Sequence, residues 1–388
     1  MPQITRRGLI KAALTTPLLA TGAYARAVET AQQDSTWVQN ARRFRPIATE
    51  EAFTIPEVLA EGRKLIAAGV SGGDMDVMKL IIRSETFSRK LQDLESERLS
   101  VMDDNGIAMQ LLSLSSPGVQ VFSPDIATGL AQVANDRLAE AISQHPTRYA
   151  GLASFAPHAP QQAVREIERA IRELKLNGLI VNSHTNGEYL DDPKYRPILE
   201  LIAELGVPLY IHPRVPPPAM SEPLQPDLNL AIWGFKVETG LHAMRLILSG
   251  IFDELPNLKI ILGHCGEGIP FWLHRLDTRY GDSAVRRNKL QRKPSEYFRD
   301  NFAVTTSGMH WNPVLKYCVE VLGIANVMFA VDYPFENTTQ AVQGLLSADF
   351  SDAEKGMIFH RNAANTFSIS PLDASPSGAA PDNLVAES

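Results

Sequence analysis

The sequence predicts a (β/α)8 TIM barrel, and two features of its apolar pattern support this. Eight short apolar runs alternate with longer stretches of helical character, as in a series of strand–helix units. The runs are almost continuously apolar, which is typical of parallel strands with helices on both faces. An open doubly wound sheet is the alternative, but no glycine-rich phosphate loop follows the first run. The expected strands cover Ile47–Phe53, Ile107–Leu112, Tyr149–Phe155, Gly178–Asn182, Val207–His212, Leu258–His264, Phe302–Thr305 and Val327–Val331.

The stretches between these runs have the pattern of amphipathic helices. Two further segments, Leu59–Ser96 and Pro213–Trp233, are longer than simple connections, and we expect them to shape the rim that carries the site. The expected helices cover Asp125–His145, Gln161–Leu176, Pro193–Leu205, Val237–Leu255 and Asn312–Leu322.

The first 27 residues have the features of a twin-arginine export signal. Arg6 and Arg7 precede an apolar stretch of small residues, which ends in the small-x-small sequence of Ala23–Ala27. The stretch is too short for a stable membrane span, and an ordinary amphipathic helix is the alternative. We therefore expect the folded protein to be exported to the periplasm and the signal to be removed.

The 388 residues are expected to form one large domain, because α/β barrels of about 250 residues or more are common as single domains. A hydrophobic content of 44% with 21% charged residues supplies enough material for its core. The expected parts are the signal at 1–27, an N-terminal extension at 28–45, the barrel domain at 46–369 and a loose tail at 370–388.

The charge balance excludes some partners. The formal net charge is −7, and removal of the signal takes away four basic residues and no acidic one, leaving about −11. An acidic surface argues against nucleic acid and against anionic membranes as partners of the mature protein. Cys265 and Cys318 are too few for a disulfide framework, and we expect unpaired, buried thiols.

Four motifs place a carboxylate or an imidazole just after an expected strand. Glu50, His212, His264 and Asp332 hold these positions. Each alone is more often a cap or a satisfied hydrogen-bond partner, but the carboxyl ends of barrel strands meet at one rim. Glu50, His212 and Asp332 together therefore predict a site for a divalent cation. Mixed oxygen and nitrogen donors suit Mn, Mg or Zn, and the residues alone do not choose between them.

His264 has a carboxylate partner three residues later, Glu267. A carboxylate in this place can orient an imidazole for proton transfer, while a buried structural histidine is the alternative. His184, in Asn182–Asn186, is a further candidate of the site. Glu51 is expected on the opposite side of the first strand from Glu50, because side chains alternate along a strand.

These motifs resemble the metal-dependent decarboxylases of the amidohydrolase superfamily, in the aminocarboxymuconate-semialdehyde decarboxylase group. The likeness extends over about residues 47–367. Asp332–Asn337 is similar to γ-resorcylate and 2,3-dihydroxybenzoate decarboxylases. Four other segments are similar to 5-carboxyvanillate decarboxylase, namely residues 47–53, 182–185, 208–213 and 237–242.

The resemblance implies a barrel with one divalent metal ion and no organic cofactor. Many members carry a histidine where this chain has Ala52, so the implied site has three protein ligands completed by water and substrate. This departure favours Mn or Mg over a tightly held Zn.

The implied activity is decarboxylation of a hydroxylated aromatic or related unsaturated carboxylic acid, a small molecule. Asp332 would protonate the ring carbon, and His264 with Glu267 would assist. In the family, the arginine that corresponds to Arg275 reaches into a neighbouring subunit, which implies a homodimer or homotetramer. The candidates for substrate binding are Arg83, Arg275, His184 and Phe335. The alternative for the two arginines is a place on the surface, and the alternative for Phe335 is packing in the core.

Two other functions remain open from the sequence. The same barrel can hydrolyse a lactone, ester or amide with a metal-bound hydroxide, and export to the periplasm favours this alternative. A periplasmic binding protein that has lost its chemistry is less consistent with the chain, because only one family ligand is missing.

Overall fold

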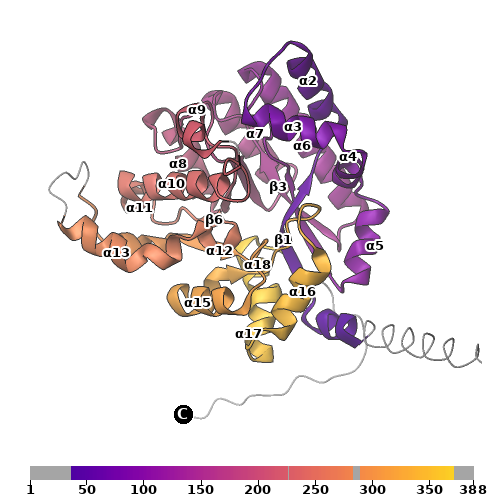
Figure 1. Ribbon diagram of the computed structural model, residues 1–388, viewed down its shortest axis with the longest axis vertical. Helices are drawn as coiled ribbons and strands as arrows, with labels where there is room; N and C mark the ends of the chain where they lie inside the picture. The colour runs from indigo at the N-terminus through magenta and orange to yellow at the C-terminus, as the bar shows by residue number, and fades with distance from the viewer. Residues whose placement is uncertain (1–35, 226, 283–288, 371–388) are drawn as a thin grey trace, which may run out of the picture.

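The eight strands form one parallel sheet in chain order, β1 to β8, surrounded by helices (Figure 1). The computed structural model describes residues 36–225, 227–282 and 289–370. The backbone N–H of Thr49 in β1 donates to the carbonyl of Phe329, just after β8, at 3.1 Å, and Asp332 donates to the Glu50 carbonyl at 2.9 Å. These bonds join the last strand to the first, so the predicted (β/α)8 barrel is confirmed.

The strands lie close to their predicted positions. The second starts and ends two residues later than expected, and the third, fifth, sixth and eighth are shorter. The bounds are β1 Ile47–Phe53, β2 Met109–Leu114, β3 Tyr149–Ser154, β4 Gly178–Asn182, β5 Leu209–His212, β6 Ile260–Leu262, β7 Phe302–Thr305 and β8 Val327–Met328.

The helices largely follow the predicted pattern, with one division. The stretch Val237–Leu255 forms two helices because Gly250 adopts a φ of 83°, which ends the first of them. The segment Leu59–Ser96 contains most of α2 and all of α3 and α4, and Pro213–Trp233 contains α9 and a 3-10 helix at Glu222–Leu224. The α-helices are α2 Pro56–Ala67, α3 Gly73–Arg83, α4 Glu85–Gln92, α5 Glu97–Asp104, α6 Pro124–Gln144, α7 Pro160–Arg172, α8 Arg196–Leu205, α9 Pro218–Ser221, α10 Gly234–Ser249, α11 Ile251–Glu254, α12 His264–Glu267, α13 Ile269–Asp282, α14 Pro294–Asn301, α15 Asn312–Leu322, α16 Thr338–Ser347, α17 Asp352–Gly356 and α18 Asn362–Thr366.

The inside of the barrel is a packed layer of side chains from alternate strand positions. Tyr210, Ile261, Ala303 and Met328 belong to this layer, in a cluster separate from the one between sheet and helices. Side chains two residues apart on a strand face the same side. The next inward positions towards the carboxyl end are therefore His212, Gly263, Thr305 and Ala330, followed by Ser307 and Asp332. The candidate site forms where this interior layer reaches the rim.

Several sequence-based expectations lie outside the described residues. These are the signal at 1–27 and all but the first residue of the tail at 370–388, so the proposed division of the chain stays a prediction. Within the expected N-terminal extension, residues 36–44 are helical. None of the helices in the described ranges has the length and apolar character needed to span a membrane.

Candidate active site

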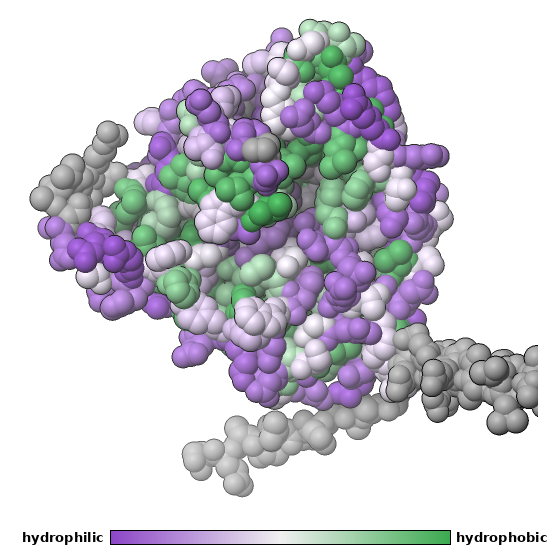
Figure 2. Space-filling model, in the orientation of Figure 1, coloured by the Kyte–Doolittle hydropathy of each residue, from purple (hydrophilic) through white to green (hydrophobic). Residues whose placement is uncertain are grey.

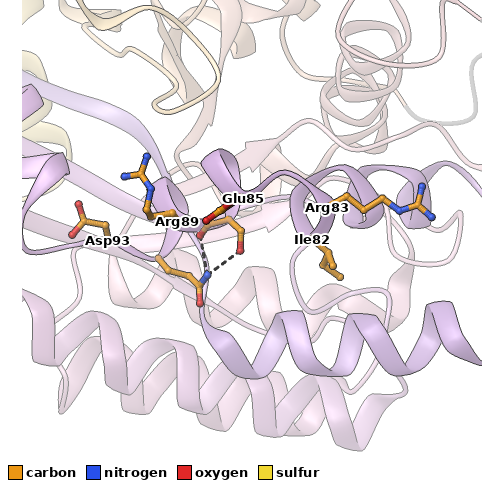
Figure 3. A pocket seen from close by; sticks show the side chains of 7 residues that line it. Ile82, Arg83, Glu85, Arg89 and Asp93 are labelled. Carbon is orange, nitrogen blue, oxygen red and sulfur yellow. Dashed lines mark hydrogen bonds between the residues drawn. The ribbon is translucent and has the colours of Figure 1, made fainter.

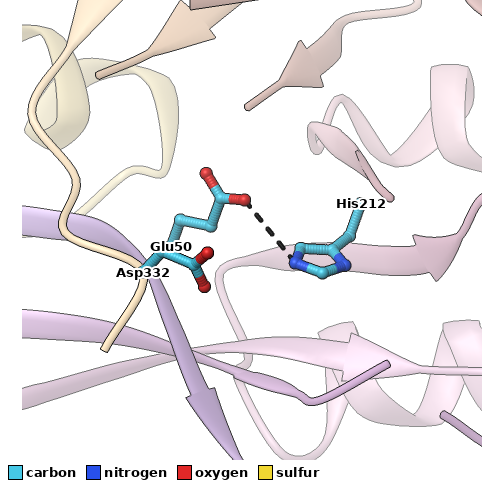
Figure 4. Close-up of side chains that lie close together, drawn as sticks. All are labelled: Glu50, His212 and Asp332. Carbon is cyan, nitrogen blue, oxygen red and sulfur yellow. Dashed lines mark ion pairs between the residues drawn. The ribbon is translucent and has the colours of Figure 1, made fainter. Parts of the chain in front are cut away.

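Glu50, His212 and Asp332 meet at the carboxyl-terminal rim of the barrel, as the sequence predicts. One ligand atom from each lies within 4.8 Å of the other two. Figure 4 shows the two carboxylates projecting towards the imidazole ring, with the Glu50–His212 ion pair drawn as a dashed line. In β1 the pairing register with β2 shifts between Ala48 and Glu51, which is a bulge. Side chains three residues apart on a regular strand face opposite sides, but Ile47 and Glu50 both face the barrel interior, because the bulge between them shifts the alternation by one residue.

The Glu50 carboxylate is fixed through one of its two oxygens. Oε2 accepts hydrogen bonds from the hydroxyls of Tyr210, Thr305 (2.9 Å) and Ser307. Oε1 is buried and has no hydrogen-bond partner among the described residues. Its nearest charged neighbours are Nε2 of His212 at 3.6 Å and Nε2 of His264 at 3.9 Å.

The surroundings of Oε1 fit a cation. Buried polar atoms are normally paired, so a carboxylate oxygen that faces two imidazoles without a hydrogen bond is suited to a positively charged partner. Gly263 borders the same oxygen, and a Cβ at that position would lie 2.8 Å from it. The absent side chain keeps open the space in which an ion would contact Glu50. The donor set of two carboxylates and one imidazole suits a divalent cation.

His212 presents a defined nitrogen to this space. Its Nδ1 lies 2.9 Å from the carbonyl oxygen of Pro213, which can only accept a hydrogen bond. Nδ1 therefore carries a proton, and Nε2 is the nitrogen that faces Glu50. A backbone carbonyl that fixes the tautomer in this way is common behind metal-binding histidines.

His264 and Glu267 stand beside the triad on an unusual turn. All residues of α12 have positive φ, from 50° at His264 to 79° at Gly266, so α12 is a left-handed turn. Such backbone is costly for residues other than glycine and is concentrated at functional sites. The turn places His264 Nδ1 2.8 Å from Oε1 of Glu267 and His264 Nε2 3.9 Å from Oδ2 of Asp332. The predicted pair is thus formed, and its free nitrogen faces the triad.

Burial and charge act against each other in this group. Burial favours a higher pKa for Glu50, but His264, His212 and the hydroxyls of Ser307 and Tyr210 hold the pKa below its usual value. Burial raises the pKa of Asp332 to about 6, although the neighbouring imidazoles of His264 and His212 oppose the change. One carboxylate of the group is therefore readily ionised, and the other keeps its proton to a higher pH.

Arg83 and Arg275, two of the four predicted substrate-binding residues, lie on the surface. Arg83 is exposed at the end of α3, where it lines a surface hollow of about 610 Å³ with Glu85 and Arg89. In Figure 3 its guanidinium points away from Arg89 and Asp93. Arg275 is exposed on α13, and no ion pair holds either Arg83 or Arg275 in the described part of the chain.

The other two candidates have partners of their own. Phe335 is 40% exposed and stacks on Phe87 of α4 at 5.5 Å between ring centroids. His184 is buried, with Nε2 2.9 Å from the Val215 carbonyl and Nδ1 accepting the Gly187 N–H. Both ring nitrogens of His184 are therefore used within the protein.

The sequence reasoning did not identify the hydroxyl groups around Glu50. Tyr210 stands two residues before His212 and faces the same side of β5, which is the signal that could have found it. Thr305 and Ser307 likewise follow the inward side of β7. Recognising their common target required the distance between strands five and seven, which the sequence does not contain.

Comparison with known proteins identifies the family to which this arrangement belongs. Residues 89–369 match the amidohydrolase family. The chain belongs to the amidohydrolase family. It is 37% identical over 336 residues to γ-resorcylate decarboxylase of Rhodococcus jostii, covering 83% of this chain and 98% of the relative.

Solved structures of this family agree with the fold. The 5-carboxyvanillate decarboxylase of Sphingomonas paucimobilis has a TM-score of 0.82 at 45% identity, covering 84% of this chain and all of that one. The 5-carboxyvanillate decarboxylase of Novosphingobium aromaticivorans, with bound manganese and a nitrobenzoic acid, has a TM-score of 0.80 at 38% identity and covers 84% and 97% of the two chains. The resemblance inferred from the motifs is confirmed.

Proposed function

We propose that the chain is a metal-dependent, cofactor-free decarboxylase of a hydroxylated aromatic carboxylic acid. The observation that carries this is the Glu50–His212–Asp332 cluster with His264 beside it, in a chain whose relatives are decarboxylases of such acids. The activity of the relatives supports decarboxylation over the hydrolysis of a lactone, ester or amide.

We propose one divalent ion, Mn²⁺ or Mg²⁺ with Zn²⁺ as the alternative, held by Glu50, His212 and Asp332. The manganese in the solved relative and the oxygen-rich donor set support Mn²⁺. The bound ion would stabilise negative charge on the substrate's carboxylate and neighbouring hydroxyl oxygen.

The protein's own residues would handle the proton. Asp332, whose pKa burial raises to about 6 before any ion is bound, would deliver a proton to the ring carbon that bears the carboxylate. The bond from that carbon to the carboxylate then breaks, its electron pair restores the aromatic ring, and carbon dioxide leaves. His264, oriented by Glu267, would hold the substrate hydroxyl and tune protonation at Asp332.

Arg83, Arg275, His184 and Phe335 stay proposals as substrate-binding residues. Because Arg275 is exposed, its contact with substrate would require a second subunit, and a homodimer or homotetramer would supply one. Phe271 and Trp272, at the start of the same helix, are 70% and 52% exposed, and large exposed apolar side chains are typical of a surface that becomes covered in an assembly. Apolar residues are also visible among polar ones on the face of the molecule shown in Figure 2. Light scattering of the purified protein would give the subunit number, and a monomer would contradict this role of Arg275.

We also propose that the protein acts in the periplasm after twin-arginine export. The support is the Arg6–Arg7 sequence and the small-x-small site that follows. Replacing both arginines with lysine should retain the protein in the cytoplasmic fraction. Unchanged periplasmic recovery of that variant would contradict the proposal.

The activity is tested by giving metal-stripped enzyme Mn²⁺ and a panel of hydroxybenzoates, then following carbon dioxide and the decarboxylated product. The variant Asp332→Asn should fold and show no turnover. No product from any acid, together with activity on a lactone panel, would refute the proposal.

A further inference from the structure

Glu51 lies next to the proposed ligand Glu50 and has no role in the proposed chemistry. Its side chain is fully buried and points away from the triad, as strand alternation predicts. It nevertheless contacts the segment that carries Asp332. Oε1 accepts the backbone N–H of Val331 at 2.9 Å, and Oε2 accepts that of Tyr333 at 3.2 Å.

The two Glu51 bonds enclose a third backbone bond. The N–H of Asp332 itself donates to the Glu50 carbonyl at 2.9 Å. Three consecutive amides, at 331, 332 and 333, are therefore held by two consecutive residues of β1. The central residue, Asp332, has a φ of 75°, a region that residues with side chains rarely adopt. Neighbouring bonds on both sides are what keep such a backbone in place.

Glu51 is in turn held by groups behind it. Gln110 of β2 donates from Nε2 to Oε2 of Glu51 at 3.3 Å. Arg98 of α5 donates to Oε1 of Gln110 at 3.1 Å, and its guanidinium lies 4.6 Å from the centroid of the Tyr333 ring. Arg98 is itself fully buried. This line of contacts leads from α5 through β2 to the loop of Asp332.

We propose that Glu51 is a positioning residue, which clamps the backbone on both sides of Asp332 and so fixes the direction of its carboxyl group. The clamp couples the first strand, which supplies Glu50, to the loop after the eighth, which supplies Asp332. Without it, Asp332 would keep its chemistry but lose its alignment with Glu50 and His212. The inference rests on the proposed roles of Asp332 as a metal ligand and proton donor.

The variant Glu51→Gln tests the clamp with almost no change of volume. Glutamine offers one acceptor oxygen, so its NH₂ group must face a donor on one side, either the Val331 N–H or the Tyr333 N–H. We expect the Mn²⁺ dissociation constant, measured by calorimetry on metal-stripped protein, to rise by about 10- to 100-fold, as for other groups that orient metal ligands. At saturating Mn²⁺ and substrate, kcat should stay lower by a similar factor while KM changes less than kcat.

The matched control is Glu166→Gln on α7. Glu166 is also a buried carboxylate held by hydrogen bonds, from Asn135 at 2.7 Å and Arg169 at 2.8 Å, but it lies in the helix layer. This variant should leave Mn²⁺ affinity and kcat within about 2-fold of the parent. Wild-type Mn²⁺ affinity and kcat in a folded Glu51→Gln protein would overturn the proposal.

If Glu51→Gln does not fold, Gln110→Met provides the test, because it removes the group that donates to Oε2 of Glu51 and so loosens the hold of Glu51 on the Val331 and Tyr333 amides. A smaller loss of Mn²⁺ affinity, about 3- to 10-fold, is expected, and unchanged affinity would overturn the clamp. The metal measurement also separates the two proposals. Failure of the enzyme to decarboxylate any acid refutes the proposed function, whereas the Mn²⁺ affinities still decide the role of Glu51.

Discussion

Replacing Tyr210 with phenylalanine should weaken Mn²⁺ binding at the proposed site without replacing any of the three proposed ligands. The Tyr210 hydroxyl donates to Oε2 of Glu50 and lies 3.0 Å from Oγ1 of Thr305. It helps to hold the pKa of Glu50 low against burial and leaves Oε1 turned towards His212. The variant keeps the ring in the barrel interior and removes only this hydroxyl.

The size of the effect follows from what remains on Oε2. A hydrogen bond to a charged group contributes about 1.5–3 kcal/mol, and removing it also leaves a buried charge less satisfied. Thr305 and Ser307 still donate to the same oxygen, so the lower value applies. A loss of about 1.5 kcal/mol corresponds to about a 10-fold higher dissociation constant for Mn²⁺.

Calorimetric titration of metal-stripped protein with Mn²⁺ measures this change directly. Tyr195→Phe is the matched control, because the Tyr195 hydroxyl also donates to a carboxylate, Glu188 at 2.9 Å, but in the connection before α8. That variant should bind Mn²⁺ like the parent protein. Wild-type affinity in a folded Tyr210→Phe protein would show that the hydroxyl does not prepare Glu50 for the ion, and would refute the reasoning.

Three further predictions concern the site and the pH dependence of stability. Gly263→Ala would place a Cβ 2.8 Å from a Glu50 oxygen that cannot easily move, so Mn²⁺ affinity should fall by about 10-fold or more; unchanged affinity in calorimetry would contradict the open space. Burial lowers the pKa of His264, but the charges of Glu267 and Glu50 outweigh burial and raise it. Glu267→Gln should therefore move the alkaline limb of the pH profile of kcat to lower pH. An unmoved limb would argue against coupling between His264 and Glu267. Burial lowers the pKa of His242 from 6.5 to about 3, so at acidic pH the unfolded chain binds a proton that the folded chain excludes. Between pH 6.5 and 5, His242 should therefore lower the free energy of unfolding by about 2 kcal/mol. In urea unfolding, His242→Gln should lose less stability than the parent by that amount, and an equal loss in both would exclude His242 as the cause.

Much of the barrel could be predicted because its signal is local. A strand buried on both faces must be apolar along its length, so β1, β4 and β7 were found with the correct bounds. The division of the helix after Gly234 at Gly250 was missed, because a glycine inside a helical pattern indicates a break only when the backbone turns there.

The site was predictable to the extent that it follows strand order. Glu50, His212 and Asp332 each end an apolar run, and a closed parallel barrel brings such positions to one rim. The arginines could not be placed in this way, since Arg83 lies in a long insertion and Arg275 on a helix, where no strand geometry fixes the side chain.

The sequence by itself determined the barrel, the family and the three residues of the candidate metal site, because all of these depend on the order and spacing of short motifs. Only the tertiary structure decided how those residues are held. The bulge in β1 turns Glu50 inwards, hydroxyls from two other strands fix one of its oxygens, and Glu51 grips the loop of Asp332 across the closure of the barrel. These contacts join residues 160 or more positions apart, and their geometry exists only once the barrel has closed.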